Sequence, residues 1–192
     1  MDNTYDGKRA AQALQAFLEA LGLDLKALDM EKTPQRVTEL YRDLFSGLQQ
    51  DTASIWGGTF ETGSDGLVAV RRMPFYSVCE HHLLPFFGTV DLVYQPREGR
   101  VAGFGKFTEL VQVLAHRPQL QERLTHQIAD SVYEELPSDG VLVVVEAEQL
   151  CMTMRDSHSL GTKTVTSESR GCLCDPVRKQ QAWLLLNRKE EE

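Results

Sequence analysis

The 192-residue sequence predicts an α+β fold in which an antiparallel sheet carries two helices on one face, preceded by further helices at the N-terminus. Three observations lead to this prediction. Apolar residues near the N-terminus recur at helical spacing. From Leu67 onward the period changes to two, which is typical of strands. In the middle of the chain, the expected order is strand, strand, helix, helix, strand, strand.

Two helices are expected in the N-terminal part. The first covers residues 8–21 and ends before Gly22. The second begins at Thr33-Pro34, a capping residue followed by proline at the first helical position, and runs to about Gly47. Residues 49–66 are rich in Gly, Ser and Thr and are expected to form a loop. We therefore expect a helical segment, residues 1–50, followed by one structural unit, residues 51–192.

The elements after Leu67 follow from the same periodicities. Two helices are expected at Lys106–His116 and after Pro118, where apolar residues recur at steps of three to four. Val141–Val145 is entirely apolar and predicts a buried strand. Together with that run, the expected strands cover residues 67–72, 75–79, 86–95, 100–104, 141–145, 150–155 and 162–167.

Composition excludes several classes of partner. The formal net charge of −8 argues against nucleic acid, because a duplex needs a basic face. No apolar stretch approaches the roughly 20 residues of a membrane span, so we expect no membrane association. The N-terminus lacks the apolar region of a secretory signal. Four cysteines without such a signal favour a cytoplasmic protein whose thiols act as ligands or nucleophiles.

The segment from Phe75 to Phe87 carries a candidate metal-binding motif. Cys79 and His82 are spaced C-x-x-H, which lets a thiolate and an imidazole reach one ion, and zinc favours both ligand types. His81 lies between them and is free for acid–base work. The pair alone is weak, because a packed cysteine beside a solvated histidine gives the same pattern. A structural zinc site would need a fourth protein ligand, whereas a catalytic site keeps three and an open position. Candidates for further ligands are Cys151, Cys172 and Cys174.

Several long motifs resemble the GTP cyclohydrolase I family from Thr33 onward. They are TPQRV at 33–37, FYSVCEHHLLPFFG at 75–88, RPQLQERLTHQIAD at 117–130, VVVEAEQLCMTMR at 143–155 and TVTS at 164–167. The resemblance implies the tunnelling fold, in which sheets of several subunits close into a barrel. It also implies a homodecamer with active sites at subunit interfaces.

The resemblance also implies roles for individual residues. The family's zinc ligands match Cys79, His82 and Cys151, which is a catalytic set of three. The histidine that protonates the purine matches His81, and its guanine-recognising pair matches Gln121 and Glu122. Such a site fits the chemistry, because zinc activates water near neutral pH and a neighbouring histidine can protonate a ring nitrogen. A glutamate can accept two N–H groups of guanine, while a glutamine can satisfy its carbonyl.

The phosphate-binding residues depart from the family pattern. Arg36, Lys106 and Arg155 match family phosphate groups. Two positions that are usually basic are acidic here, Glu39 and Glu109, and Gly105 replaces a serine. A like-charge contact near 4 Å costs about 1 kcal/mol in water and about 4 kcal/mol near a protein surface. Triphosphate binding is therefore expected to weaken, unless the two glutamates turn aside to pair with basic residues.

Gln149 is a further departure, because the family has a histidine two residues before the second zinc cysteine. A glutamine can orient a water or a carbonyl but cannot shuttle a proton near pH 7. Gln149 stands among the catalytic candidates. We expect the first hydrolytic step to survive the loss of the histidine, whereas the later steps, which are formate loss, ribose rearrangement and pterin ring closure, are expected to be impaired.

Three functions follow as hypotheses. The first is a zinc hydrolase that opens the imidazole ring of a guanine-type purine without a triphosphate: a nucleoside, a base or an oxidised purine. The second is an ordinary GTP cyclohydrolase I that forms 7,8-dihydroneopterin triphosphate and formate. The third is a non-catalytic paralogue that keeps zinc and binds a purine.

Overall fold

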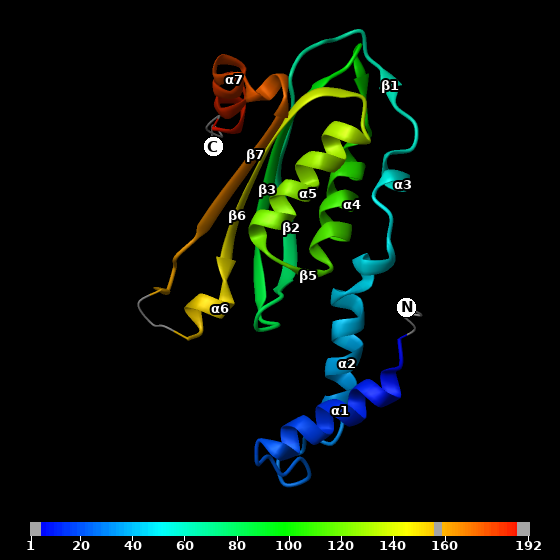
Figure 1. The fold of residues 1–192 in the computed structure, drawn as a ribbon, viewed down its shortest axis with the longest axis vertical. Helices are drawn as coiled ribbons and strands as arrows, with labels where there is room; N and C mark the ends of the chain where they lie inside the picture. The colour runs from blue at the N-terminus through cyan, green and yellow to red at the C-terminus, as the bar shows by residue number, and fades with distance from the viewer. Residues whose placement is uncertain (1–4, 156–158, 188–192) are drawn as a thin grey trace, which may run out of the picture. The chain divides into compact units, whose positions relative to one another are not determined.

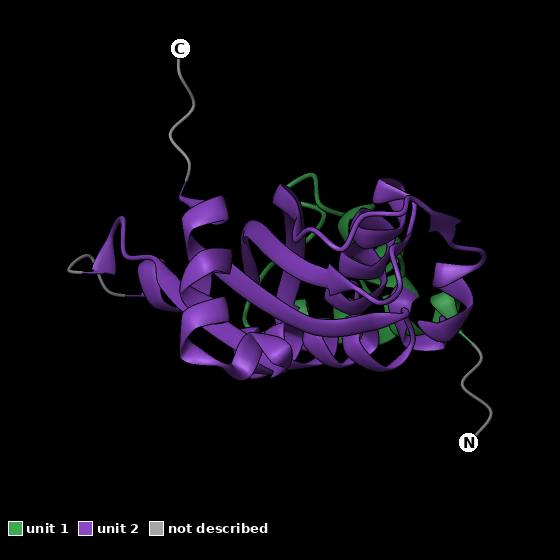
Figure 2. Cartoon of the chain, turned by 90° about the horizontal axis from the view of Figure 1, so that it is seen from above, with its two compact units in different colours: residues 1–46 green, residues 47–192 purple. Residues whose placement is uncertain are grey.

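The computed structural model describes residues 5–155 and 159–187. Contacts divide the chain into two compact units, residues 1–46 and residues 47–192 (Figure 2). A compact unit need not fold independently, so the expected domains, residues 1–50 and 51–192, remain a proposal. Within the described residues, no helix is both long and apolar enough to cross a membrane.

The N-terminal unit contains the two expected helices, α1 (Gly7–Ala20) and α2 (Thr33–Leu44). The side chain of Asp6 caps α1 by accepting a hydrogen bond from the backbone N–H of Arg9, at 3.0 Å. Proline stands in the first turn of α2, where its missing N–H leaves no intrahelical bond unmade. The polar face of α2 carries Arg36 and Glu39, both of which are exposed.

A five-stranded sheet forms the centre of the second unit, in the order β5-β2-β3-β6-β7 (Figure 1). Its neighbours are antiparallel except for β5 and β2, which run parallel. The strands are β2 (Val68–Cys79), β3 (Pro85–Pro96), β5 (Pro118–Gln119), β6 (Ser138–Gln149) and β7 (Thr164–Gly171). A separate pair joins β1 (Phe60–Glu61) to β4 (Arg100–Val101).

The helices α4 (Phe104–Ala115) and α5 (Gln121–Glu134) cover one face of this sheet (Figure 1). Their apolar sides share one core with the sheet, in which Phe75, Phe107 and Leu124 are completely buried. The predicted α+β architecture, with two helices on one face of an antiparallel sheet, is confirmed.

The other face of the sheet packs against α7 (Pro176–Leu186), a helix that the sequence pattern did not predict. Alternate residues of Val141–Val145 therefore enter different cores. Val141, Val143 and Val145 belong to the core beneath α4 and α5, whereas Leu142 and Val144 face α7. Coverage on both faces explains why this strand is apolar throughout rather than alternating.

Five expected elements differ in the structure. The strand expected at 100–104 is limited to Arg100–Val101, and Phe104 already belongs to α4. The strands expected at 67–72 and 75–79 form the single strand β2, which is interrupted by a bulge between Val70 and Met73. The expected loop 49–66 contains a short helix, α3 (Ala53–Trp56), besides β1. The strand expected at 150–155 is wrong, because residues Leu150–Thr153 form the one-turn helix α6.

The end of the β3–β6 ladder explains why α6 is not a strand. The ladder ends where β3 begins, because Phe86 is the first residue of β3 that pairs with β6 and lies opposite Gln149, the last residue of β6. Pro85 has no N–H to donate, and residues 80–82 form a turn, so the chain beyond Gln149 has no strand beside it. The backbone groups are satisfied instead within a helical turn, in which the N–H of Met154 donates to the oxygen of Leu150 at 3.0 Å.

Candidate metal centre

A tight turn at the end of β2 places two of the expected metal ligands, Cys79 and His82. The N–H of Cys79 donates to the oxygen of Leu84, and the N–H of Leu83 donates back to the oxygen of Cys79, both at 2.9 Å. Leu83 has a φ of 54°, in the left-handed region that a non-glycine residue rarely occupies. The C-x-x-H spacing is therefore held in a closed loop rather than an extended strand.

The third expected ligand comes from α6. Cys151 lies on this helix, and one ligand atom each from Cys79, His82 and Cys151 fall within 4.8 Å of one another. Zinc–ligand bonds of about 2.0–2.3 Å place two ligands of a tetrahedral ion roughly 3.5 Å apart. The donor set of two sulfurs and one imidazole nitrogen is one that zinc prefers, so these residues fit a metal ion.

The environment of the Cys151 thiol favours its neutral form when no cation is nearby. Burial raises the pKa of the Cys151 thiol, and the neighbouring Cys79 sulfur raises it further. Cys79 is buried in the core, while Cys151 is half-buried. A divalent cation would reverse this preference, because a coordinating thiol is deprotonated.

Arg155 contacts the expected histidine ligand, His82, with its Nη1 atom 3.1 Å from Nε2 of the ring. Arginine can only donate, so Nε2 accepts in this arrangement. A metal bound through Nε2 would use the same lone pair, and a metal bound through Nδ1 would leave a proton on Nε2. Either case requires Arg155 to move away from the ring, which would release its guanidinium toward solvent.

His81 is exposed beside the cluster but does not belong to it. The His81 and His82 rings are edge-on, with centroids 6.3 Å apart and planes at 79°. The adjacent histidines therefore point in different directions. One joins the cysteines, and the other is accessible to a bound molecule.

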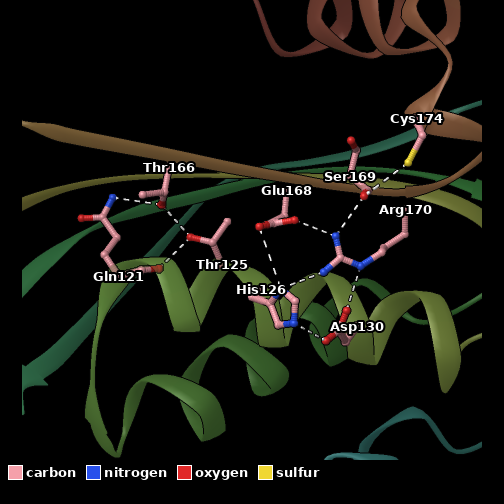
Figure 3. A network of polar contacts seen from close by, with 9 residues as sticks. All are labelled: Gln121, Thr125, His126, Asp130, Thr166, Glu168, Ser169, Arg170 and Cys174. Atoms are coloured by element: carbon pink, nitrogen blue, oxygen red, sulfur yellow. Dashed lines mark hydrogen bonds and ion pairs between the residues drawn. The ribbon is translucent and has the colours of Figure 1, made fainter.

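Gln121 and Gln149 are hydrogen-bonded to each other. Nε2 of Gln149 donates to Oε1 of Gln121 at 2.7 Å. The Gln121 side chain is buried, and its own Nε2 donates to the oxygens of Val145 at 3.0 Å and Thr164 at 2.9 Å. Figure 3 shows this amide directed toward Thr166, at the start of α5. Both ends of the Gln121 amide have partners within the protein. The contact with a guanine carbonyl that the resemblance implies stays a prediction, and it would need an N–H of Gln121 to leave one of these oxygens.

Glu122, the next residue, has the opposite character. Its carboxylate is exposed and makes no hydrogen bond or ion pair with any residue that the structure describes. It follows Gln121 in the first turn of α5, as the sequence predicts. A carboxylate held free in this way can accept two N–H groups from a ligand.

An ion pair that sequence reasoning missed lies beside the motif. Arg123 donates to both carboxylate oxygens of Glu80, at 2.6 and 3.2 Å, and lowers the pKa of that carboxyl. The signal was present, because Glu80 stands within Cys-Glu-His-His and Arg123 directly follows Glu122. These opposite charges lie in two motifs that are far apart in the sequence, and only the fold shows that they form a pair.

Comparison with known proteins identifies the family of the chain. The family model described as GTP cyclohydrolase I matches residues 10–187. The chain belongs to the GTP cyclohydrolase I family.

Three relatives in this family cover most of the chain. It is 48% identical to GTP cyclohydrolase 1 of Geobacillus kaustophilus (strain HTA426), over 83% of this chain and 85% of that protein. The identity to GTP cyclohydrolase 1 of Carboxydothermus hydrogenoformans (strain ATCC BAA-161 / DSM 6008 / Z-2901) is 45%, over 90% of both chains. The identity to GTP cyclohydrolase 1 of Streptococcus agalactiae serotype V (strain ATCC BAA-611 / 2603 V/R) is 41%, over 95% of this chain and 97% of that protein. A solved structure of an apo archaeosine synthase QueF-Like overlaps 56% of this chain and 96% of its own, with 23% identity and a TM-score of 0.45.

The acidic departures from the GTP cyclohydrolase I pattern have partners on their own helices. Glu109 forms an ion pair with Lys106 at 3.0 Å on α4, and both side chains are substantially exposed. On α2, Nε2 of Gln35 donates to Glu39 at 2.9 Å. One glutamate thus turns to a basic residue and the other to an amide. Arg36 lies on α2 in the N-terminal unit, whereas Lys106 and Arg155 belong to the second unit.

Proposed function

We propose that the protein is a zinc-dependent GTP cyclohydrolase I that converts GTP to 7,8-dihydroneopterin triphosphate and formate. The observation that carries this proposal is the Cys79–His82–Cys151 cluster, with ligand atoms within 4.8 Å, in a chain 41–48% identical to proteins named GTP cyclohydrolase 1. The substrate class, a purine opened by a cyclohydrolase, follows from the family.

The three ligands would hold zinc and leave one coordination position open, as catalytic zinc sites do. Zinc bound there activates water for attack at neutral pH. His81 is the proton donor to the ring nitrogen whose bond to carbon breaks, because it is exposed beside the cluster and an imidazole can act as a general acid. Glu122 binds the amino and ring N–H groups of the guanine through its unpaired carboxylate.

The triphosphate contacts decide between GTP and an unphosphorylated purine. Three basic residues stand at positions where the family binds phosphate. They are Arg36 in the first unit and Lys106 and Arg155 in the second unit. Glu39 and Glu109 stand where the family has basic residues, but they weaken triphosphate binding less than their charges suggest. An exposed ion pair such as that of Lys106 and Glu109 is worth about 0–1 kcal/mol, so a triphosphate can displace the carboxylate. Repulsion of exposed charges is closer to about 1 than to about 4 kcal/mol per contact.

We also propose a homo-oligomer, expected to be a decamer with active sites at subunit interfaces. The proposal is supported by the sheet order, in which β7 is an outer strand. Edge strands carry backbone groups that can pair with another chain. The long β7 of eight residues offers such an edge in the described part of the second unit.

The decisive test supplies zinc-loaded protein with GTP, guanosine, guanine or 8-oxoguanosine at equal concentration. Loss of each purine is measured by chromatography, because an oxidised purine releases no formate and a free base forms no pterin. Formate release and pterin fluorescence are recorded beside it. We expect GTP to give both products and the other purines to react at least tenfold more slowly. Faster turnover of guanosine or of an oxidised purine would replace GTP by the unphosphorylated substrate. Zinc binding without turnover of any purine would indicate the non-catalytic paralogue.

A further inference from the structure

We propose that the first turn of α5 is a clamp that sets the geometry of the metal centre, with Glu80, Arg123 and Gln149 as positioning residues. The two ligand-bearing segments, Cys79–His82 and Cys151, come from distant parts of the sequence. Each is tied by a side-chain contact to the same helical turn, at Arg123 and at Gln121. The inference rests on the metal centre proposed above, and not on which purine reacts there.

The Cys79–His82 turn is held through Glu80. The fork of Arg123 contacts both oxygens of this carboxylate, which fixes its orientation as well as its distance. The backbone N–H of Glu80 also donates to the oxygen of Gln119 at 3.1 Å, on β5 immediately before α5. Two contacts therefore bind the residue that follows Cys79 to the start of the helix.

The Cys151 segment is held through Gln149. This residue ends β6 and stands at the N-cap of α6, two positions before the cysteine. Its side chain donates to Gln121, whose side chain is only 3% exposed and is fixed by the backbone oxygens of β6 and β7. A buried amide with every group paired is rigid, because breaking any of its bonds leaves a desolvated polar atom.

Glutamine suits this task better than histidine does. Its amide stays neutral at any pH near 7, whereas an imidazole changes charge there. It places an N–H opposite the Oε1 of Gln121 without depending on a tautomer. In this chain residue 149 therefore acts on the metal ligands through Gln121, and it is not a proton carrier. Glu122 lies between the two clamp residues of α5, so the same contacts also fix the guanine-binding carboxylate.

Zinc affinity tests the clamp without reference to turnover. Gln149→Leu, Glu80→Gln and Arg123→Met are compared with the unchanged protein by competition against a chromophoric chelator. We expect zinc to bind about 10–100-fold more weakly in each variant, as when groups that orient metal ligands are lost. Cobalt-loaded protein supplies a second readout, because altered ligand geometry changes the intensity of its visible absorption bands. Arg123→Lys should recover only part of the affinity, since lysine cannot make the two-pronged contact.

Arg170→Met is the matched control. Arg170 also pairs with an acidic residue of α5, Asp130, at 2.9 Å, but it contacts neither ligand segment (Figure 3). We expect its zinc affinity to stay within twofold of the unchanged protein. Circular dichroism establishes that each variant is folded at the assay temperature.

Zinc affinity within twofold in all three folded clamp variants would overturn the inference, as would an equal loss in Arg170→Met. Failure of the unchanged protein to bind zinc would overturn it together with the proposed metal centre. A protein that binds zinc and shows the expected losses, yet does not convert GTP, would refute the proposed reaction and leave the clamp intact.

Discussion

Two stretches of α5 use polar side chains in opposite ways. The first turn ties Gln121 and Arg123 to the segments that carry the metal ligands and leaves Glu122 without a described partner. Further along the helix, His126 and Asp130 form a closed network with Arg170 of β7 (Figure 3). The first region holds one carboxylate without a described partner, that of Glu122, between two paired side chains. The other satisfies its own charges and fastens the edge strand.

Both ring nitrogens of His126 have partners in the second region. Nε2 contacts Asp130 at 3.0 Å, and Nδ1 lies 2.9 Å from Nη2 of Arg170 and 3.9 Å from Oε1 of Glu168. Polar residues of one helix can therefore be sorted by their partners. A side chain that is paired within the protein stabilises the structure, whereas one without a partner is a candidate for binding a ligand.

Loss of a metal ligand is the largest effect expected. Cys151→Ala should weaken zinc binding by at least about 10³-fold and abolish turnover, because two ligands do not form a catalytic site. Zinc competition and formate release measure the two effects. The zinc-free variant should unfold at nearly the same urea concentration as zinc-free unchanged protein, since Cys151 is only half-buried. Retention of tight zinc binding would exclude Cys151 from the site.

Removal of the proton carrier separates chemistry from binding. His81→Ala should lower kcat by about 10²–10⁴-fold, the usual contribution of general acid catalysis. Its zinc affinity should not change, because His81 lies outside the ligand cluster. The neighbouring His82→Ala is the matched comparison and should lose both zinc and activity. An equal loss of zinc in the two variants would mean that the histidines do not have separate roles.

Disruption of the second region should affect stability alone. Arg170→Met removes contacts to Asp130 and Glu168 and should lower the free energy of unfolding by about 1 kcal/mol, a magnitude typical of partly screened ion pairs. Urea denaturation measures this change. The Michaelis constant for GTP should stay the same. A large change in that constant, with stability unaffected, would reverse the assignment of the two regions.

The same region should contribute to acid sensitivity. The hydrogen bond from Arg170 lowers the pKa of Glu168 below its ordinary value of 4.5. A carboxyl with a lowered folded-state pKa adds stability above its unfolded-state pKa, and this stability disappears as the pH falls through the folded-state value. Glu168→Gln should therefore destabilise the protein at pH 7 and much less at pH 3. Equal destabilisation at both pH values would show that the charge of Glu168 is unimportant.

The smallest effect is expected at the phosphate position. Glu109→Gln removes the carboxylate that pairs with Lys106 and should lower the Michaelis constant for GTP by about two- to fivefold, equivalent to about 1 kcal/mol or less. Steady-state kinetics at low ionic strength provides the measurement. The constant for guanosine should not move, because it has no phosphate. A similar change for both substrates would place Glu109 away from the phosphates.

Local patterns in the sequence were sufficient for most of the second unit. The two-residue period and the apolar run Val141–Val145 predicted strands, because their side chains report directly on burial. The motif at Cys79 and His82 predicted a metal site because the types of the two ligands and their spacing are both visible within four residues of sequence. The helix α6 was missed, since residues 150–155 resemble a strand and only the end of the β3–β6 ladder excludes one.

Contacts between distant residues could not be predicted in the same way. Gln121 was expected to bind guanine, but its amide is occupied by Gln149 and by the backbone of β6 and β7. The pair of Glu80 and Arg123 joins positions 43 residues apart. Whether a polar side chain faces a ligand or a neighbour depends on tertiary packing, which the periodicity of one segment does not contain.

Anomalous scattering at the zinc absorption edge, from crystals of the protein purified without added metal, tests the central claim most directly. We expect one strong peak per chain, bonded to the Sγ atoms of Cys79 and Cys151 and to the imidazole of His82. Absence of a peak, with a disulfide joining the two cysteines, would contradict it.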